Sequence, residues 1–201
     1  MTDRFVSLLR HGEPQGGGRF RGGHDDPLSD AGWAQMWAQV RCGGLEHLIT
    51  RVVSSPARRC AEFAQALAEA RGLPLAISPA LGERCFGDWE GLAAHEIPPD
   101  ELTRFWDDPV GYSPPNAEAF AAFRERILAG WVEVLAGADA HTLVVTHGGG
   151  VRVILAQVLG LTDSSGLLIE VAPAALSRLR VPMDPGRPSL MLHCGTPGGT
   201  E

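Results

Sequence analysis

Two histidines in the sequence occupy the same local context, directly after a short apolar run and before a glycine. His11 follows residues 5–9 and Arg10, and His147 follows residues 142–146. Runs of this length are typical of buried strands, whose carboxyl ends form the edge at which open α/β folds bind ligands. If the two strands are neighbours in one sheet, both imidazoles lie together at that edge. A single histidine after a strand is usually a loop or capping residue, so the interpretation depends on the pair.

Arginines lie beside glycine-rich segments or at the ends of predicted strands. They are Arg10, Arg19, Arg21, Arg58 and Arg59. The net charge of −7 argues against a nucleic acid or an anionic membrane as partner. Local arginines in an acidic protein suit a small anionic ligand, although any one of them alone would usually be a solvated surface residue. Arg58 and Arg59 fall in the first turn of a predicted helix, where the dipole disfavours a cation unless an anion is bound.

Glycine is concentrated in two segments next to the two histidines. Residues 12–24 include six glycines, and residues 148–150 are all glycine. Backbone N–H groups in such a loop, and at the start of the helix predicted from about residue 151, can bind an anion. The loop is not a Walker loop, because no Gly-Lys-Ser/Thr sequence follows. Residues 24–26, His-Asp-Asp, resemble a metal-binding cluster only superficially.

A segment rich in carboxylates and glycines, residues 81–91, supplies candidates for a general acid. Glu83 falls near a strand edge and Glu90 lies farther out. An exposed charged loop is the alternative interpretation. In residues 92–115, prolines interrupt short helical patterns. This insertion is expected to form a lid over a site.

The spacing of the apolar residues predicts an alternation of strands and helices. Strands are expected at residues 5–9, 50–54, 75–78, 142–146, 169–171, 175–181 and 190–193, with one antiparallel edge among the last of them. Helices are expected at about residues 30–42, capped by Ser29, at 56–71, starting at Pro56 and ended by Gly72, at 117–136 and at 151–159.

Size and composition bound the class of protein. The 201 residues, of which 44% are apolar, suit one globular domain over residues 1–201 that buries about 70% of its unfolded surface. No apolar run reaches about 18 residues and the first residues do not resemble a signal peptide, so we expect a cytoplasmic protein without a membrane span. The four cysteines form no Cys-x-x-Cys pair, which favours reduced apolar thiols over a zinc site.

Two histidines, several arginines, a carboxylate and glycine-rich loops are together the components of phosphoryl transfer without a metal or other cofactor. Arginines neutralise the phosphoryl oxygens, one imidazole attacks phosphorus and becomes phosphohistidine, and a carboxylic acid protonates the leaving alkoxide. Water then breaks the P–N bond. The attacking imidazole must be neutral, and neighbouring arginines lower its pKa.

Four motifs resemble those of the histidine phosphatase superfamily, which has the phosphoglycerate-mutase-like fold. The motifs are Leu9-Arg10-His11-Gly12-Glu13, Ser55-Pro56-Ala57-Arg58-Arg59-Cys60, residues 83–91 and Val145-Thr146-His147-Gly148-Gly149. The resemblance extends over about residues 5–161. It implies an α/β three-layer sandwich, with a mainly parallel sheet and helices on both faces.

The same resemblance implies roles for individual residues. His11 would be the nucleophile and Glu83 the proton donor. Arg59 is preferred to Arg58 because the arginine of the family falls four residues after the serine that matches Ser55. The residues implied to hold the phosphoryl group are Arg10, Arg59 and His147.

Within the superfamily, the chain is most similar to α-ribazole phosphatases of cobalamin biosynthesis, through residues 22–32, 105–109 and 114–115. The similarity implies α-ribazole 5′-phosphate or adenosylcobalamin 5′-phosphate as substrate. A broad-specificity sugar-phosphate or phosphoglycerate phosphatase or mutase is the alternative. Gln15 and residues 115–119 depart from the relatives, which affects the identity of the substrate rather than the chemistry. The expected substrate-binding residues are Arg10, Arg59, His147, Gly148, Gln15, Arg21 and Gly22.

Two other functions fit parts of the sequence. Residues 147–150, His-Gly-Gly-Gly, match an oxyanion motif of acyl hydrolases, but no Gly-x-Ser-x-Gly nucleophile motif exists in the chain. A non-catalytic phosphoryl-binding module could dispense with His11 or Glu83, and both are present. We therefore expect an enzyme acting on a small phosphorylated substrate, with a homodimer as a candidate assembly. The sequence leaves open whether Glu90 or Glu118 assists Glu83.

Overall fold

The computed structural model describes residues 3–42, 44–137, 139–183 and 186–195. The strands of its central sheet are β1 (Arg4–Arg10), β2 (Arg51–Ser54), β3 (Leu75–Ile77), β4 (His141–Thr146), β5 (Leu176–Val181) and β6 (Ser189–Cys194). They lie in the order β3-β2-β4-β1-β5-β6. The pairs β1–β4, β4–β2 and β2–β3 are parallel, whereas β5 runs antiparallel to β1 and β6 antiparallel to β5. The expected mainly parallel sheet is therefore confirmed.

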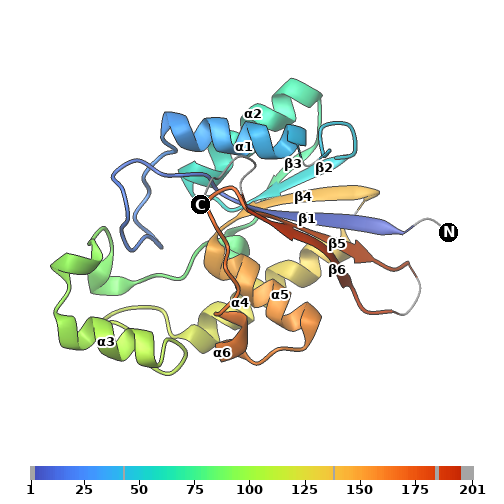
Figure 1. Ribbon diagram of the computed structural model, residues 1–201. Coiled ribbons are helices and arrows are strands. Elements are labelled where there is room, and N and C mark those ends of the chain that lie inside the picture. The colour runs from blue at the N-terminus through green and yellow to red at the C-terminus, as the bar shows by residue number, and fades with distance from the viewer. Residues whose placement is uncertain (1–2, 43, 138, 184–185, 196–201) are drawn as a thin grey trace.

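Helices cover both faces of the sheet (Figure 1). The helices are α1 (Asp30–Cys42), α2 (Arg58–Arg71), α3 (Pro99–Asp107), α4 (Phe120–Ala136), α5 (Gly148–Leu159) and α6 (Asp163–Gly166), and the 3-10 turns are η1 (Pro79–Leu81), η2 (Gly87–Trp89) and η3 (Ala94–Glu96). α1 and α2 lie on one face, and α4 and α5 lie on the other. The expected three-layer sandwich is thus confirmed. Within the described residues, no helix is long and apolar enough to cross a membrane.

The strand β1 contributes to both cores. Val6 and Leu8 pack in the cluster that contains the buried side chains of α4 and α5, and Leu9 packs in the cluster that contains those of α1 and α2. This division follows from the geometry of a strand, because successive side chains point to opposite faces of the sheet. The strand that ends before His11 is therefore held by apolar packing on both faces of the sheet.

Helix ends follow local chemistry. The Ser29 hydroxyl accepts the N–H of Gly32 at 3.0 Å and caps α1, as expected. Gly72 ends α2 with a φ of 63°, also as expected. α2 begins at Arg58 rather than at Pro56, because the intervening Ala57 has a non-helical ψ of 137°.

The expectation of a strand at residues 169–171 is wrong. This segment is irregular and is held by arginine side chains instead of by a strand partner. Arg152 Nε donates to the carbonyl of Ile169 at 2.8 Å, and Arg10 Nη1 donates to that of Val171 at 2.5 Å. Guanidinium groups satisfy the carbonyls that a neighbouring strand would otherwise bind.

Two helices begin at residues other than those expected. The helix predicted from residue 151 begins at Gly148, so the three glycines belong to its first turn. The helix predicted from residue 117 begins at Phe120. Ala119, just before it, has an extended ψ of 142°, so the helix does not reach back to residue 117.

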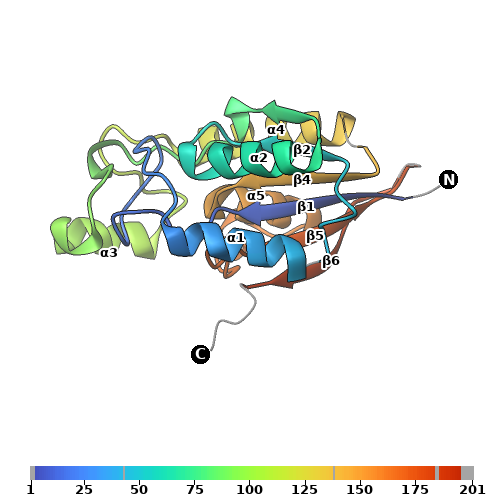
Figure 2. The same cartoon turned by 90° about the horizontal axis from the view of Figure 1, so that it is seen from above.

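Residues 92–115, which contain η3 and α3, lie beyond the carboxyl ends of the parallel strands and beside the glycine-rich loop (Figures 1 and 2). Phe20 joins the two segments, because its N–H donates to the carbonyl of Leu92 and its carbonyl accepts the N–H of Gly91, both at 2.9 Å. Aromatic side chains form a separate apolar cluster here, centred on Trp89, Ile97 and Phe105.

Candidate functional site

The two strand-ending histidines meet at the carboxyl edge of the sheet. The parallel register of β1 and β4 pairs Arg10 with Thr146, and these are the residues directly before His11 and His147. The ring centroids of the two imidazoles are 5.2 Å apart, and the ring planes are inclined at 67°. Both side chains are buried. The juxtaposition expected from the sequence is therefore present in the structure.

The hydrogen bonding of His11 defines its tautomer. Nδ1 lies 2.7 Å from the carbonyl oxygen of Gly12. A carbonyl oxygen only accepts, so Nδ1 carries the proton and Nε2 has a free lone pair. Burial lowers the pKa of His11 to about 3, and the charges of Arg10 and Arg59 act in the same direction. The imidazole is consequently neutral and nucleophilic at physiological pH.

His147 is oriented by a serine that the sequence did not single out for a role. Its Nε2 lies 2.7 Å from Ser55 Oγ, which accepts the N–H of Ala57 at 3.3 Å. The Ser55 hydroxyl can therefore donate its hydrogen to Nε2, in the tautomer that has the imidazole proton on Nδ1. Burial lowers the pKa of His147 well below its ordinary value, and the proximity of His11 adds to this effect.

Arg59 is the largest fully buried side chain, although arginine is among the residues least often buried. Its Nη atoms donate to the carbonyls of His24 at 3.1 Å, Arg21 at 3.2 Å and Gly22 at 3.4 Å. By contrast, Arg58 is exposed and pairs with a glutamate on its own helix. The preference for Arg59 over its neighbour therefore matches the burial of the two side chains.

Three buried polar atoms around the histidines have no hydrogen-bond partner in the part of the chain that is described. They are Arg10 Nε, Arg59 Nε and His147 Nδ1. An unsatisfied buried donor costs about 1–3 kcal/mol, so three of them in one site require an explanation. An anion bound among these groups would satisfy all three.

Glu83 is among the residues that line three of the clefts in the described structure. Backbone N–H groups hold its carboxylate in place. Its Oε2 accepts the N–H of Gly149 at 3.1 Å, and its Oε1 accepts the N–H of Arg84 at 3.0 Å. An added Cβ at position 149 would lie 2.3 Å from Oε1 of Glu83, so the carboxylate would have to leave this position. The glycines after the second histidine thus allow α5 to approach this carboxylate.

The two other glutamates of the region have different partners. Glu118 pairs with Arg126 at 2.8 Å, and Arg126 also donates to the carbonyl of Glu83 at 3.2 Å. Glu90 accepts backbone N–H groups of the glycine-rich loop, including that of Gly22 at 3.0 Å. Neither carboxylate is hydrogen-bonded to the carboxylate of Glu83.

The remaining predicted substrate-binding residues lie in the loop between β1 and α1 or at the start of α5. Gln15 donates to the carbonyl of Leu28 at 3.3 Å. Arg21 is buried, pairs with Asp26 at 2.6 Å and borders a cleft together with His11. Gly148 lies in the first turn of α5. Among the residues that the structure describes, no group of three or more His, Cys, Asp or Glu side chains could hold a metal ion. This includes the side chains of residues 24–26.

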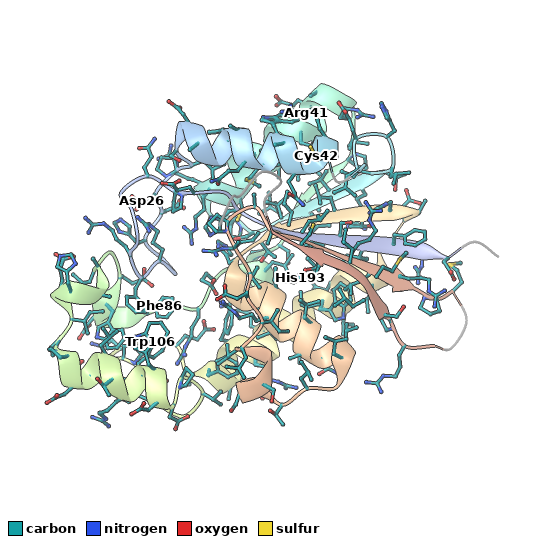
Figure 3. All side chains as sticks on the ribbon, viewed as in Figure 1. Asp26, Arg41, Cys42, Phe86, Trp106 and His193 are labelled. Carbon is teal, nitrogen blue, oxygen red and sulfur yellow. The ribbon has the colours of Figure 1, made fainter. Side chains whose placement is uncertain are left out.

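A cleft of about 630 Å³ lies beside Glu83, and several aromatic rings are among the residues that line it. Phe86, just before η2, and Trp106, in α3, lie near each other below Asp26 in the view of Figure 3. Trp106 is 61% exposed although it is a large apolar side chain. The aromatic and apolar residues of this cleft are Phe20, Phe86, Phe105, Trp106, Phe120, Phe123, Leu167 and Leu168.

Sequence reasoning missed the groups that orient the predicted residues. Ser55 was part of a motif without a function of its own, and the Gly149 N–H was not connected with Glu83. Arg152 borders the aromatic cleft, yet only its charge and its helix position could have marked it. These roles depend on contacts between distant segments, for which a single sequence has no local signal.

Comparison with known proteins identifies the family. The model of the histidine phosphatase superfamily (branch 1) matches residues 6–193. The chain belongs to this superfamily. The matched range contains both histidines, Arg59 and Glu83, and the expected family and fold are confirmed.

Individual relatives of this chain have several names. A bifunctional protein of Mycobacterium tuberculosis is 34% identical over 178 residues, which cover 83% of this chain and 47% of the relative. The chain thus spans about half the length of that relative. An adenosylcobalamin/alpha-ribazole phosphatase of Salmonella typhimurium is 29% identical over 168 residues, covering 79% of this chain and 81% of the relative. A mycobacterial glucosyl-3-phosphoglycerate phosphatase, solved with VO3, has a TM-score of 0.79 at 26% identity and covers 94% of this chain and 98% of its own.

Proposed function

We propose that this site hydrolyses phosphate monoesters through a phosphohistidine formed at His11. The observation that carries the proposal is the arrangement of three unsatisfied buried donors, on Arg10, Arg59 and His147, around a neutral imidazole with a free Nε2. A phosphoryl group offers three equatorial oxygens, which is the number of these donors. Relatives named as phosphatases support the same chemistry.

In the first step, His11 Nε2 attacks phosphorus in line with the ester oxygen. The P–N bond forms as the P–O bond breaks, and the leaving oxygen takes the proton of the Glu83 carboxyl group. Donors on Arg10, Arg59 and His147 stabilise the charge on the equatorial oxygens. No metal ion takes part in this step.

In the second step, the Glu83 carboxylate accepts a proton from water as the water oxygen attacks phosphorus. The P–N bond breaks, and inorganic phosphate and neutral His11 are released. The N–H of Gly149 holds the carboxylate in place for both steps. Burial of His11 serves this cycle, because an imidazole that stays unprotonated can act again at once.

We propose α-ribazole 5′-phosphate or adenosylcobalamin 5′-phosphate as the substrate. The Salmonella relative named for these compounds supports the proposal. The aromatic cleft adjoins Glu83, the proposed proton donor, and rings that line it, such as Phe86 and Trp106, offer apolar faces on which a planar benzimidazole base would stack. Residues 92–115 would then act as the lid that carries one wall of this cleft.

A glucosyl-3-phosphoglycerate or related phosphoglycerate ester is the second candidate, because two arginines, Arg84 and Arg152, line the same cleft. The Arg84 guanidinium is buried and bonded to backbone carbonyls, whereas Arg152 is partly exposed and could bind a substrate carboxylate. A mycobacterial neighbour named for glucosyl-3-phosphoglycerate supports this alternative. The two candidates differ in whether the leaving group is aromatic or anionic.

A panel of phosphate esters tests the proposal. It contains α-ribazole 5′-phosphate, adenosylcobalamin 5′-phosphate, glucosyl-3-phosphoglycerate, 3-phosphoglycerate and a sugar phosphate, with His11→Ala as the control. We expect kcat/KM to be highest for the two cobalamin precursors, by about tenfold or more, and to vanish for every ester in the variant. The opposite ranking would favour the phosphoglycerate alternative. Unchanged turnover by His11→Ala would refute the phosphohistidine itself.

A further inference from the structure

Glu90 binds the glycine-rich loop through an unusual number of backbone donors. Its Oε1 accepts the N–H groups of Gly22 and Gly23, both at 3.0 Å, and of Phe86 at 2.7 Å. Its Oε2 accepts the N–H of His24 at 2.8 Å and shares that of Gly22 at 3.0 Å. A carboxylate with this many short N–H donors has a fixed position and orientation.

The same turn holds Arg59 from its opposite side. Arg59 Nη2 donates to the carbonyls of Arg21 and Gly22, and Nη1 donates to that of His24. The carbonyl of Arg21 and the N–H of Gly22 belong to one peptide group, as do the carbonyl of Gly22 and the N–H of Gly23. In a trans peptide these two ends point in opposite directions.

Two peptide dipoles are therefore aligned between a carboxylate and a guanidinium. Their N–H ends face Glu90 and their carbonyl ends face Arg59. The negative charge of Glu90 therefore polarises the peptide groups so that their carbonyls bind Arg59 more strongly, and the positive charge of Arg59 likewise strengthens the N–H bonds to Glu90. No direct contact joins the two side chains in the described structure; the turn is the connection. We propose that Glu90 is a positioning residue for Arg59, which fixes the guanidinium that binds the phosphoryl group. This proposal rests on the proposed function.

The surroundings of the turn leave it little freedom. An added Cβ at Gly22 would lie 2.0 Å from the carbonyl oxygen of Arg84, so the turn is pressed against the segment that follows Glu83. Burial alone would raise the pKa of Glu90, but its backbone N–H donors outweigh burial and lower the pKa below its ordinary value. Glu90 thus stays ionised at neutral pH and accepts hydrogen bonds from all of these N–H groups.

A double-mutant cycle tests the proposal with orthovanadate as the ligand, because direct binding by calorimetry does not require turnover. Glu90→Gln keeps the size of the side chain but replaces one accepting oxygen with a donor. We expect it to weaken vanadate binding about tenfold in the wild-type background and at most about twofold in the Arg59→Ala background. If Arg59→Ala binds too weakly to measure, Arg59→Lys takes its place. An equal loss in both backgrounds would overturn the proposal.

Matched variants distinguish a loss of Arg59 positioning from a general loss of structure. Glu96→Gln removes a carboxylate that caps the N–H of Ala93 in the same part of the chain, and it should leave vanadate binding unchanged. Glu90→Asp keeps the charge and should recover part of the loss. If Glu90→Gln does not fold, the cycle is run with Glu90→Asp under the same criterion.

The outcomes also distinguish this inference from the proposed function. Wild-type protein that neither binds vanadate nor hydrolyses phosphate esters would overturn both. Wild-type protein that does both, with no coupling between Glu90 and Arg59, would overturn the positioning role alone.

Discussion

Lowering the pH from 7 to 5 should destabilise this protein through His11. Burial lowers the pKa of His11 from 6.5 to about 3, with Arg10 and Arg59 contributing in the same direction. Between these two pKa values, His11 therefore binds a proton in the unfolded chain and stays unprotonated in the folded chain. A folded-state pKa below the unfolded value means that unfolding is favoured progressively as the pH falls below about 6.5.

The expected magnitude follows from the two pKa values. Each pH unit below the unfolded pKa costs about 1.4 kcal/mol until the folded pKa is reached, so His11 accounts for a loss of about 2 kcal/mol between pH 7 and pH 5. The side chain is only 7% exposed, so solvent screening reduces this figure little. His147, which is fully buried, adds a loss in the same direction.

Urea unfolding followed by tryptophan fluorescence at pH 7, 6 and 5 measures this loss. His11→Asn removes the titrating ring and keeps a donor for the Gly12 carbonyl, so its free energy of unfolding should fall by about 2 kcal/mol less than that of the wild type. Phosphate is omitted from the buffers, because a bound anion would stabilise the folded state. His47→Asn, which removes an exposed imidazole, should behave as the wild type does. Equal pH dependence of His11→Asn and wild type would refute the reasoning.

Three further changes have defined outcomes. Glu83→Gln should lower kcat/KM about 100-fold for alkyl phosphates and about tenfold or less for aryl phosphates, because only poor leaving groups need its proton. An equal loss of kcat/KM for both classes in steady-state assays would contradict this role. Prolonged EDTA treatment should leave kcat unchanged, and a loss restored by divalent ions would show that a metal takes part. Trp106→Ala should raise KM for α-ribazole 5′-phosphate about three- to tenfold and leave glycerol phosphate unaffected, as measured by phosphate release.

The parts of the site that depend on where strands end could be predicted from the sequence, whereas the pairing of β1 with β4 was only a condition of that prediction. His11 and His147 each end a short apolar run, and this local pattern indicates both the strands and the edge where they meet. Arg59 could be chosen over Arg58 only through the resemblance to a family, because adjacent arginines look alike in sequence. Burial separates them in the structure.

The parts that depend on contacts between distant segments could not be predicted. Glycines are poor helix formers, so a helix start at Gly148 has no local signal; it is required by the approach of α5 to Glu83. The segment at residues 169–171 is apolar enough to resemble a strand, but Arg10 and Arg152 bind its carbonyls. The connection from Glu90 to Arg59 passes through backbone groups, which a sequence pattern does not record.

Trapping the phosphorylated enzyme tests the central claim most directly. Wild-type protein is mixed with a phosphate ester, quenched in base within the first turnover, and digested for mass spectrometry. We predict an acid-labile, base-stable phosphoryl group on His11 in the wild type and none on any histidine of His11→Ala. Rapid hydrolysis by the wild type with no phosphohistidine at any quench time, or with the phosphoryl group on His147 instead, would contradict the account.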